Sequence, residues 1–311
     1  MQAHTNAKVQ RFDIYMGIVV TVVKDIAKST EFLTSALGLG PWEIAAESTL
    51  KEDMIIGEPF SIKVATAKLG PVVLELVQPL DDRSVWAHFL KDKGEGLYNI
   101  AVGVSNWDAA VSKLQACGNR MVLAAFDRTT FSEPRRWCLF DAKPGELIVE
   151  FIECREENEL VTSLCPPSNT DANAISSLEH IGVVVKDMDK TTKFLSSTLG
   201  LGPWDIFEYS TIKDEVTVGE PFRVKTAHTN LGPTILELLQ PLDEGSIWVH
   251  LLKTKGEGLH NIAFNVSNYD EWVSKLQGQG ATIVLGAIFR GKRWCYLDTK
   301  VGGITFELIE A

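Results

Sequence analysis

The chain repeats itself at a fixed offset, and this repeat restricts the folds open to it more than any other feature. GEPFSIKVATAKLGPVVLELVQPLDDRSVWAHFL begins at Gly57 and reappears as GEPFRVKTAHTNLGPTILELLQPLDEGSIWVHLL at Gly219, an offset of 219 − 57 = 162. KGEGLYNIAVGVSN, from Lys93, returns as KGEGLHNIAFNVSN, from Lys255, and 255 − 93 is again 162. A period this long exceeds that of solenoid repeats and indicates two duplicated domains in tandem.

A polar segment separates the two copies. REENELVTSLCPPSNTDANAISS contains Pro166 and Pro167 and lacks strong hydrophobic periodicity, which is typical of a linker. We therefore place a first domain at residues 1–158, a linker at 159–176 and a second domain at 177–311. Near the end of each copy the offset falls to 307 − 150 = 157, so the second copy has lost five residues from a loop.

Each copy reads as a strand, a helix and three strands, written twice. In the second copy HIGVVV is a β-branched strand, and DMDKTTKFLSSTLG predicts a helix capped by Asp187 that ends at Gly200. Strand patterns follow around WDIFEYST, FRVKTAHT and TILELLQ. The order returns with LHNIAFNV, the helix YDEWVSKLQGQG and the strands TIVLGAIF, RWCYLD and ITFELIE. The predicted fold class is α+β, with two β-α-β-β-β modules in each domain.

The composition excludes several classes of function. Lys and Arg number 30 and Asp and Glu 41, so the net charge of −11 disfavours a general binder of nucleic acids or anionic membranes. No apolar run approaches the ~18 residues of a membrane span, and the first residues do not resemble a signal peptide. The 5 cysteines show no CxxC spacing, which argues against a disulfide framework or zinc knuckle. We expect a cytoplasmic protein with a small-molecule substrate.

Several polar side chains stand inside strands that are otherwise apolar. Side chains alternate across a strand, so Asn261 should face the concave side of the sheet while His260 shares the core face with Ile262, unless a β-bulge precedes Asn261. Glu237 lies within ILELL and Glu307 within ITFEL. A buried, unpaired carboxylate costs several kcal/mol, so two of them on symmetric strands predict a shared cation. Carboxylates with an imidazole and a carboxamide suit Mn²⁺, Fe²⁺, Co²⁺, Ni²⁺ or Mg²⁺ better than structural zinc.

The motifs EHIGVVVKDMDKTTKFLSSTLGLGP, LELLQPL, GEGLHNIAF and ITFELIE together resemble the vicinal oxygen chelate superfamily, within it the methylmalonyl-CoA epimerase and glyoxalase I branch. The resemblance covers nearly the whole chain, once per copy. It implies two tandem domains, each of two βαβββ modules that curl into a cleft holding one divalent metal ion (Mn, Fe, Co, Ni, Mg or Zn). The metal ligands that it implies are His180, Glu237, Asn261 and Glu307. Asn261 departs from the family motif, which has a histidine there.

The first copy has no histidine at the matching positions. They are Ile18, or Tyr15 if a gap of three residues is allowed, together with Glu75, Asn99 and Glu150. This predicts a degenerate first site. If the two glutamates share a pocket without metal, one of them should retain its proton, because like charges placed close together do not both ionise.

The function that the resemblance implies is proton transfer beside a carbonyl group. The metal would stabilise an enolate, Glu237 or Glu307 would be the catalytic base, and the result would be epimerisation, isomerisation or elimination. Lys225 and His228, in FRVKTAHT, are candidate substrate-binding residues; the alternative is a solvated strand face. We expect the paired tryptophans Trp86/Trp248 and Trp137/Trp294 to serve the fold.

Two other functions remain open. A metal-free protein that sequesters a small molecule, of the bleomycin-resistance type, would explain the degenerate first copy and Asn261. Ring-cleaving extradiol dioxygenases share the tandem layout, but they use two histidines and one glutamate, which Asn261 and Glu237 do not match. The chain is expected to act on a small carbonyl compound as a monomer with pseudo-dimeric domains or as a homodimer.

Overall fold

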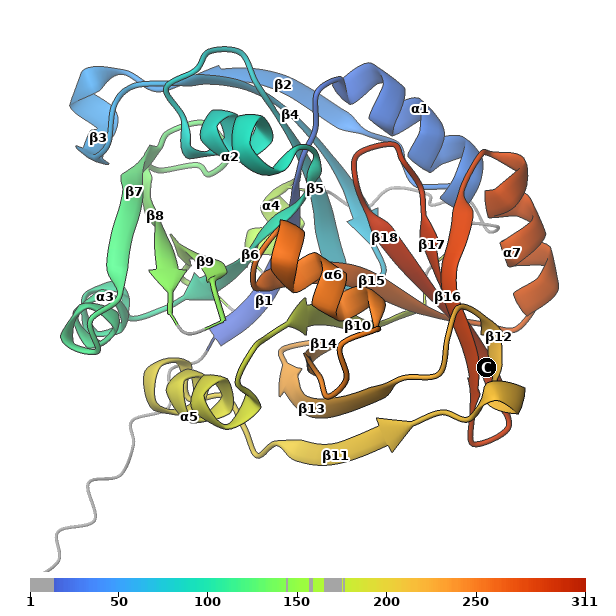
Figure 1. Ribbon diagram of the computed structural model, residues 1–311. Coiled ribbons are helices and arrows are strands. Elements are labelled where there is room, and N and C mark those ends of the chain that lie inside the picture. Colours follow the sequence, from blue (N-terminus) through green and yellow to red (C-terminus); the bar gives the residue numbers. More distant parts are fainter. Residues whose placement is uncertain (1–13, 144, 157–158, 165–174, 176) are drawn as a thin grey trace, which may run out of the picture.

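Each copy of the repeat forms its own sheet. The computed structural model describes residues 14–143, 145–156, 159–164, 175 and 177–311, and in this part of the chain each half contributes one nine-stranded sheet (Figure 1). The strand orders are β2-β4-β5-β1-β6-β9-β8-β7-β3 and β11-β13-β14-β10-β15-β18-β17-β16-β12. The same order in both sheets confirms the tandem duplication and the α+β class.

The elements of the first half are β1 (Ile14–Val22), α1 (Ile26–Leu37), β2 (Glu43–Ser48), a helical turn (Lys51–Asp53), β3 (Met54–Ile56), β4 (Ser61–Leu69), β5 (Val72–Pro79), α2 (Val85–Lys93), β6 (Gly96–Val104), α3 (Trp107–Ala116), β7 (Arg120–Asp127), β8 (Arg135–Ala142), β9 (Leu147–Glu153) and α4 (Glu159–Leu164). Those of the second half are β10 (Leu178–Val184), α5 (Met188–Leu199), β11 (Asp205–Ser210), a helical turn (Lys213–Glu215), β12 (Val216–Val218), β13 (Arg223–Leu231), β14 (Thr234–Pro241), α6 (Ile247–Thr254), β15 (Gly258–Val266), α7 (Tyr269–Gly278), β16 (Thr282–Phe289), β17 (Lys292–Asp298) and β18 (Thr305–Glu310).

The helix boundaries follow the capping signals in the sequence. The Asp187 side chain accepts a hydrogen bond from the backbone N–H of Lys190, and α5 ends at Gly200, whose φ of 72° suits glycine. The predicted order of strands and helices is confirmed. Sequence patterns missed α2, α6 and the short strands β3 and β12, because three residues or a helix of two turns are too short for a clear period.

The two modules of each half join at the centre of its sheet. In the second half β10 runs parallel to β14 and antiparallel to β15, and β15 runs parallel to β18. The modules therefore meet where the strands β10 and β15 pair, and the strands that carry the polar residues of interest lie side by side at the centre of the sheet.

Helices of the two halves pack against each other in a reciprocal way. α1 contacts α7, and α5, the counterpart of α1, contacts α3, the counterpart of α7 (Figure 1). One apolar core joins these helices to the sheet face of each half that they cover, here called the outer face, for example through Leu33, Leu195 and Leu276. The opposite, inner face of each sheet has a separate apolar cluster. The exchange of equivalent elements is the arrangement of a two-fold dimer within one chain.

Part of the predicted linker is ordered against the first half. Residues 159–164 form α4, and Leu160, only 2% exposed, packs on the inner cluster of the first sheet. Residues 165–174 and 176 lie outside the described part of the chain. Among the described residues no helix has the length and hydropathy required to cross a bilayer.

Candidate metal centre and its cavity

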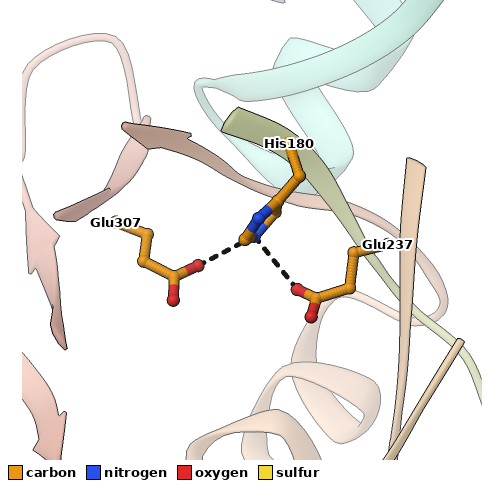
Figure 2. A group of neighbouring side chains, drawn as sticks. All are labelled: His180, Glu237 and Glu307. Carbon is orange, nitrogen blue, oxygen red and sulfur yellow. Dashed lines mark hydrogen bonds and ion pairs between the residues drawn. The ribbon is translucent and has the colours of Figure 1, made fainter. Parts of the chain in front are cut away.

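Three of the predicted ligands converge on the concave face of the second sheet. His180 of β10 lies between Glu237 of β14 and Glu307 of β18, as Figure 2 shows. The His180 Nε2 atom is 3.1 Å from Glu237 Oε2 and 3.0 Å from Glu307 Oε2. All three side chains are buried, and one ligand atom from each lies within 4.8 Å of the others. Among the described residues this is the one such group of His, Cys, Asp and Glu.

The charges of these three residues depend on one another. Burial alone would lower the pKa of His180, but the charges of Glu237 and Glu307 outweigh burial and raise it well above its usual value. Burial likewise favours the neutral form of Glu237, yet the charge of His180 holds its pKa below the usual range. The pKa of Glu307 is raised, first by burial. The two carboxylates thus surround a positive charge in a site shielded from water.

Two further residues fix the orientation of the cluster. Glu179 accepts a hydrogen bond from His180 Nδ1, which leaves Nε2 free to face the carboxylates. His228 Nε2 lies 2.8 Å from Glu237 Oε1. Carboxylate partners of this kind fix the ring orientation of metal-binding histidines in proteins. Glu179 was not among the residues predicted from the sequence, although its place directly before a ligand histidine was the available signal.

Asn261 faces the cluster, but with its amide nitrogen. Its Nδ2 donates to Glu307 Oε2 over 2.9 Å and lies 3.4 Å from His180 Nε2, while its Oδ1 is 2.9 Å from His260 Nδ1. Coordination of a metal through Oδ1 would require the amide to turn over and leave His260. In this arrangement Asn261 supports Glu307, and its role as a direct metal ligand stays a prediction.

A β-bulge at His260 changes the side on which this residue lies. Gly182 pairs with Asn261 and the next residue, Val183, pairs with Leu259, so His260 is left out of the register. Its ring packs edge-on against Tyr296 of the inner cluster, with centroids 4.8 Å apart. The expectation that His260 shares the core face with Ile262 was wrong, because the extra residue breaks the alternation. Burial lowers the pKa of His260 to about 4, so it is neutral.

Lys225 and His228 are separated by the sheet. His228 lines the cavity over the cluster, whereas Lys225 is not among the lining residues and pairs with Asp189 of α5 at 2.8 Å. The two residues stand three apart on one strand, so alternation places them on opposite faces. The grouping of Lys225 with the site is therefore corrected, and His228 alone remains a candidate for contact with a substrate.

The cavity over the cluster holds about 180 Å³ and is walled mainly by aromatic rings. Tyr296 packs edge to face with Trp248 and with Trp294 beside the cluster, and Tyr209 and Phe289 also line the cavity. The paired tryptophans are therefore part of the cavity wall as well as of the fold. Their repetition in both copies suggested packing, and only the curvature of the sheet brings them to the site.

The first half has the same geometry without the histidine. Ile18 pairs with Ala101 as His180 pairs with Ala263, which selects Ile18 over Tyr15 as the counterpart. Glu150 accepts a hydrogen bond from Asn99 Nδ2 over 3.0 Å.

The protonation predicted for this first-half pair of glutamates agrees with the structure. Burial raises the pKa of Glu75 well above its usual value and that of Glu150 to about 7. The charge of Glu150 raises the pKa of Glu75 further, and Asp127 and Glu47 act on both residues in the same direction. At least one carboxyl of the pair therefore keeps its proton near neutral pH.

This pair should make stability fall as the pH rises. Between the ordinary pKa of 4.5 and the folded value of about 7, the folded protein retains a proton on Glu150 that the unfolded chain releases. The stabilisation is complete below the lower value and is lost as pH rises through the higher one, by at most ~3 kcal/mol. Between pH 5 and pH 8 the free energy of urea unfolding should fall in the wild type. In Glu150→Gln this fall should be smaller by ~1–2 kcal/mol. Glu43→Gln, on exposed strand β2, should keep the wild-type difference; equal curves for all three proteins would contradict the assignment.

The donor set of the second half fits a divalent cation. Two carboxylates and an imidazole converge within 4.8 Å, and oxygen with nitrogen ligands suit Mg²⁺, Mn²⁺, Fe²⁺, Co²⁺, Ni²⁺ or Zn²⁺. His180, Glu237 and Glu307 would hold the ion, with Glu179, His228 and Asn261 behind them. The first half lacks the imidazole and has no such convergence among its described residues.

Comparisons with known proteins give the same assignment for both halves. A sequence profile described as the glyoxalase/bleomycin resistance protein/dioxygenase superfamily matches residues 19–133 and 179–296. Human mitochondrial methylmalonyl-CoA epimerase is 30% identical over 144 residues, 44% of this chain and 75% of that protein. The uncharacterized protein YqjC of Bacillus subtilis is 29% identical over 143 residues, 44% of this chain and 93% of its own.

Solved structures resemble the whole chain. A mutant of 4-hydroxymandelate synthase from Streptomyces coelicolor superposes with a TM-score of 0.66 over 95% of this chain and 92% of its own, at 14% identity. A hypothetical protein from Staphylococcus aureus gives a TM-score of 0.52 over 96% of this chain and 100% of its own, at 11% identity. At these identities the likeness shows the fold alone, in its two-domain form.

Proposed function

Since the chain belongs to the glyoxalase/bleomycin resistance protein/dioxygenase superfamily, we propose that its second half is a metal-dependent epimerase, isomerase or lyase for a small carbonyl compound. The observation that carries the proposal is the buried convergence of His180, Glu237 and Glu307 beneath a cavity. The resemblance of half the chain to human methylmalonyl-CoA epimerase supports this reaction class.

The chain's own residues supply binding and proton transfer. A bound divalent ion would act as a Lewis acid that stabilises negative charge on a carbonyl oxygen. The aromatic wall excludes water and holds the apolar part of a substrate. His228 faces the cavity and is held by Glu237, so its ring can accept or return a proton without leaving a ligand position. Glu237 and Glu307, the bases expected from the resemblance, are bonded to His180 and Asn261 and act better as ligands.

The proposal is tested on the purified protein. Elemental analysis should find about one divalent ion per chain. The protein is incubated in D₂O with 2-methyl-branched acyl thioesters and, separately, with 2-oxo acids, and deuterium uptake is followed by NMR. One of the two substrate classes should gain deuterium beside its carbonyl group, without consumption of oxygen. Oxygen uptake with a catechol would instead favour a ring-cleaving dioxygenase. A protein that holds no ion and catalyses no exchange would contradict the proposal.

The second candidate is a metal-free binding protein. It is favoured by the hydrogen bonds that already satisfy the polar cluster: His180 bonds to Glu179 and Glu307, and Asn261 bonds to Glu307 and His260. This function predicts tight binding of a small molecule with neither bound metal nor exchange.

His228→Ala separates the proton-transfer role from metal binding. We expect the exchange rate at a saturating concentration of metal ion to fall about 10²-fold, because general acid–base catalysis typically contributes at least this factor, while the metal content under these conditions stays near one ion per chain. Lys225→Ala is the matched control on the opposite face of the same strand and should change the rate less than about twofold. Equal effects of the two substitutions would remove His228 from the mechanism.

A further inference from the structure

The first half has a cavity of its own, larger than that of the second half. It holds about 370 Å³, which is within the range of small-molecule sites. One wall is aromatic: the Phe60 and Trp86 rings lie 5.2 Å apart, and the Trp86 and Trp137 rings 6.2 Å apart. The second half has equivalent rings, which are Phe222, Trp248 and Trp294. The chemistry that distinguishes the two cavities therefore lies at other positions.

The first-half cavity has an excess of acidic side chains. Its lining includes Glu47, Asp53, Glu75, Asp127 and Glu150. Arg128 is the one basic side chain in this lining, and it is hydrogen-bonded to Asp53. Burial, with repulsion from Asp127, raises the pKa of Glu47 to about 7. Apart from the Arg128–Asp53 pair, four carboxyl groups therefore line the cavity with no basic side chain beside them, and one of the four, Asp127, also accepts hydrogen bonds from Thr129 and Thr130.

Two of these acids replace aromatic residues of the second half. Strand register places Glu47 where Tyr209 stands and Asp127 where Phe289 stands. In the second half the two rings contact each other with centroids 4.5 Å apart. In the first half both positions are acidic, so the same pair of facing strands has exchanged rings for carboxylates. An exchange at both members of a contacting pair points to a difference in ligand rather than to random surface variation.

The acids of the first half do not converge as those of the second half do. His180, Glu237 and Glu307 form the one converging group of three in the described residues, and no set of three from Glu47, Glu75, Asp127 and Glu150 joins them. A cation that pairs with several of these carboxyls is therefore matched better by an extended organic group than by a metal ion. An ammonium group on an organic body fits, because it also gains cation–π attraction from tryptophan faces.

One buried acceptor beside these acids lacks a partner. Asn99 is fully buried and its Oδ1 has no hydrogen-bond partner, whereas the equivalent oxygen of Asn261 is paired with His260. Tyr98 replaces that histidine in the first half. The Nδ2 of Asn99 donates to Glu150, which lines the cavity. Buried polar groups usually have partners, so the oxygen of Asn99 can accept a hydrogen bond from a donor that reaches Glu150, as a protonated amine does.

We propose that the first half binds a small organic cation, a protonated amine or quaternary ammonium group carried on an apolar or aromatic body. Glu75 and Glu150 hold the positive charge against the wall of Trp86 and Trp137, and Glu47 and Asp127 complete the negative surface. The ligand site is separate from the metal centre of the second half and does not depend on the reaction proposed there.

Titration calorimetry of the full chain at pH 8 tests this site. The probes are phenethylamine and benzyltrimethylammonium, with neutral 2-phenylethanol as the matched control. The expected result is that both cations bind at least about tenfold more tightly than the alcohol. If the alcohol binds as tightly as the cations, or if neither cation binds, the proposal is overturned.

Substitution of first-half residues by their second-half counterparts tests whether the cation binds in the first-half cavity. Glu47→Tyr with Asp127→Phe gives the first half the residues that the second half accommodates at the same places, and should weaken cation binding at least tenfold. Glu47→Gln alone, on an edge strand, serves if the double variant does not fold, and should weaken binding about threefold. His180→Ala should leave the binding constant within twofold, which separates this site from the metal centre. Unchanged binding in the first two variants would overturn the assignment.

Discussion

Glu307→Gln should reduce the bound divalent metal from about one ion per chain to background and slow substrate proton exchange by about 10⁴-fold. Glutamine keeps the shape of the side chain but removes one of the two carboxylate charges that surround His180. It also offers only one oxygen in place of two, and that oxygen is needed by His180 and Asn261, which both contact Oε2 of Glu307. Metal analysis and NMR exchange measure the two effects independently.

The first half supplies a matched control for that substitution. Glu150 occupies the equivalent position on β9 and also accepts from an asparagine, Asn99. Glu150→Gln should therefore leave the metal content and the exchange rate at wild-type values. If Glu307→Gln retained the ion and the full rate, or if Glu150→Gln lost the ion, the metal centre would have been placed in the wrong residues.

Gly182→Ala should lower the free energy of unfolding by ~2–5 kcal/mol and weaken metal binding by about 10–100-fold. A Cβ atom at Gly182 would lie 2.0 Å from Asn261 Oδ1 and 2.8 Å from its Cγ. The buried amide would have to shift, which breaks the hydrogen bond of its oxygen to His260 and disturbs the one from its nitrogen to Glu307. Urea unfolding and metal titration measure the two losses.

Two comparisons test the reason given for this effect. Gly278→Ala, at the exposed end of α7 where a Cβ would meet nothing within 4 Å, should change stability by no more than ~1 kcal/mol, in the stabilising direction. Adding Asn261→Ala to Gly182→Ala should cost less than the two substitutions do separately, because the clash disappears. The first half has Val20 at the matching position, so the backbone itself accepts a side chain there. Additive effects in the double variant would show that the clash is not the cause.

Patterns of short range predicted much of the architecture. The order of strands and helices and the cap at Asp187 appear as a hydrophobic period or as a single residue type, which neighbouring residues along the chain determine. The duplication was visible because whole segments recur at an offset of 162 residues. His180, Glu237 and Glu307 could be selected because a charged or imidazole side chain inside an apolar strand is conspicuous. The structure then brings these three to one point.

Other features depended on how strands pair. The bulge at His260 shifts one side chain across the sheet, and no local pattern distinguishes a bulged strand from a regular one. The amide of Asn261 turns its nitrogen to Glu307 because His260 takes its oxygen, an outcome that depends on both neighbours. Lys225 is the exception, since counting three positions from His228 would have placed it on the other face.

Residue periodicity and residue type were enough to predict a tandem pair of α+β domains whose second copy carries a histidine and two glutamates inside apolar strands. The orientation of the Asn261 amide toward Glu307 and the acidic lining that Glu47 and Asp127 give to the first cavity became visible only in the folded protein. The physical reason is that period and burial are properties of each strand, whereas the direction of an amide and the meeting of side chains from strands far apart in sequence depend on register, bulges and the curvature of the sheet.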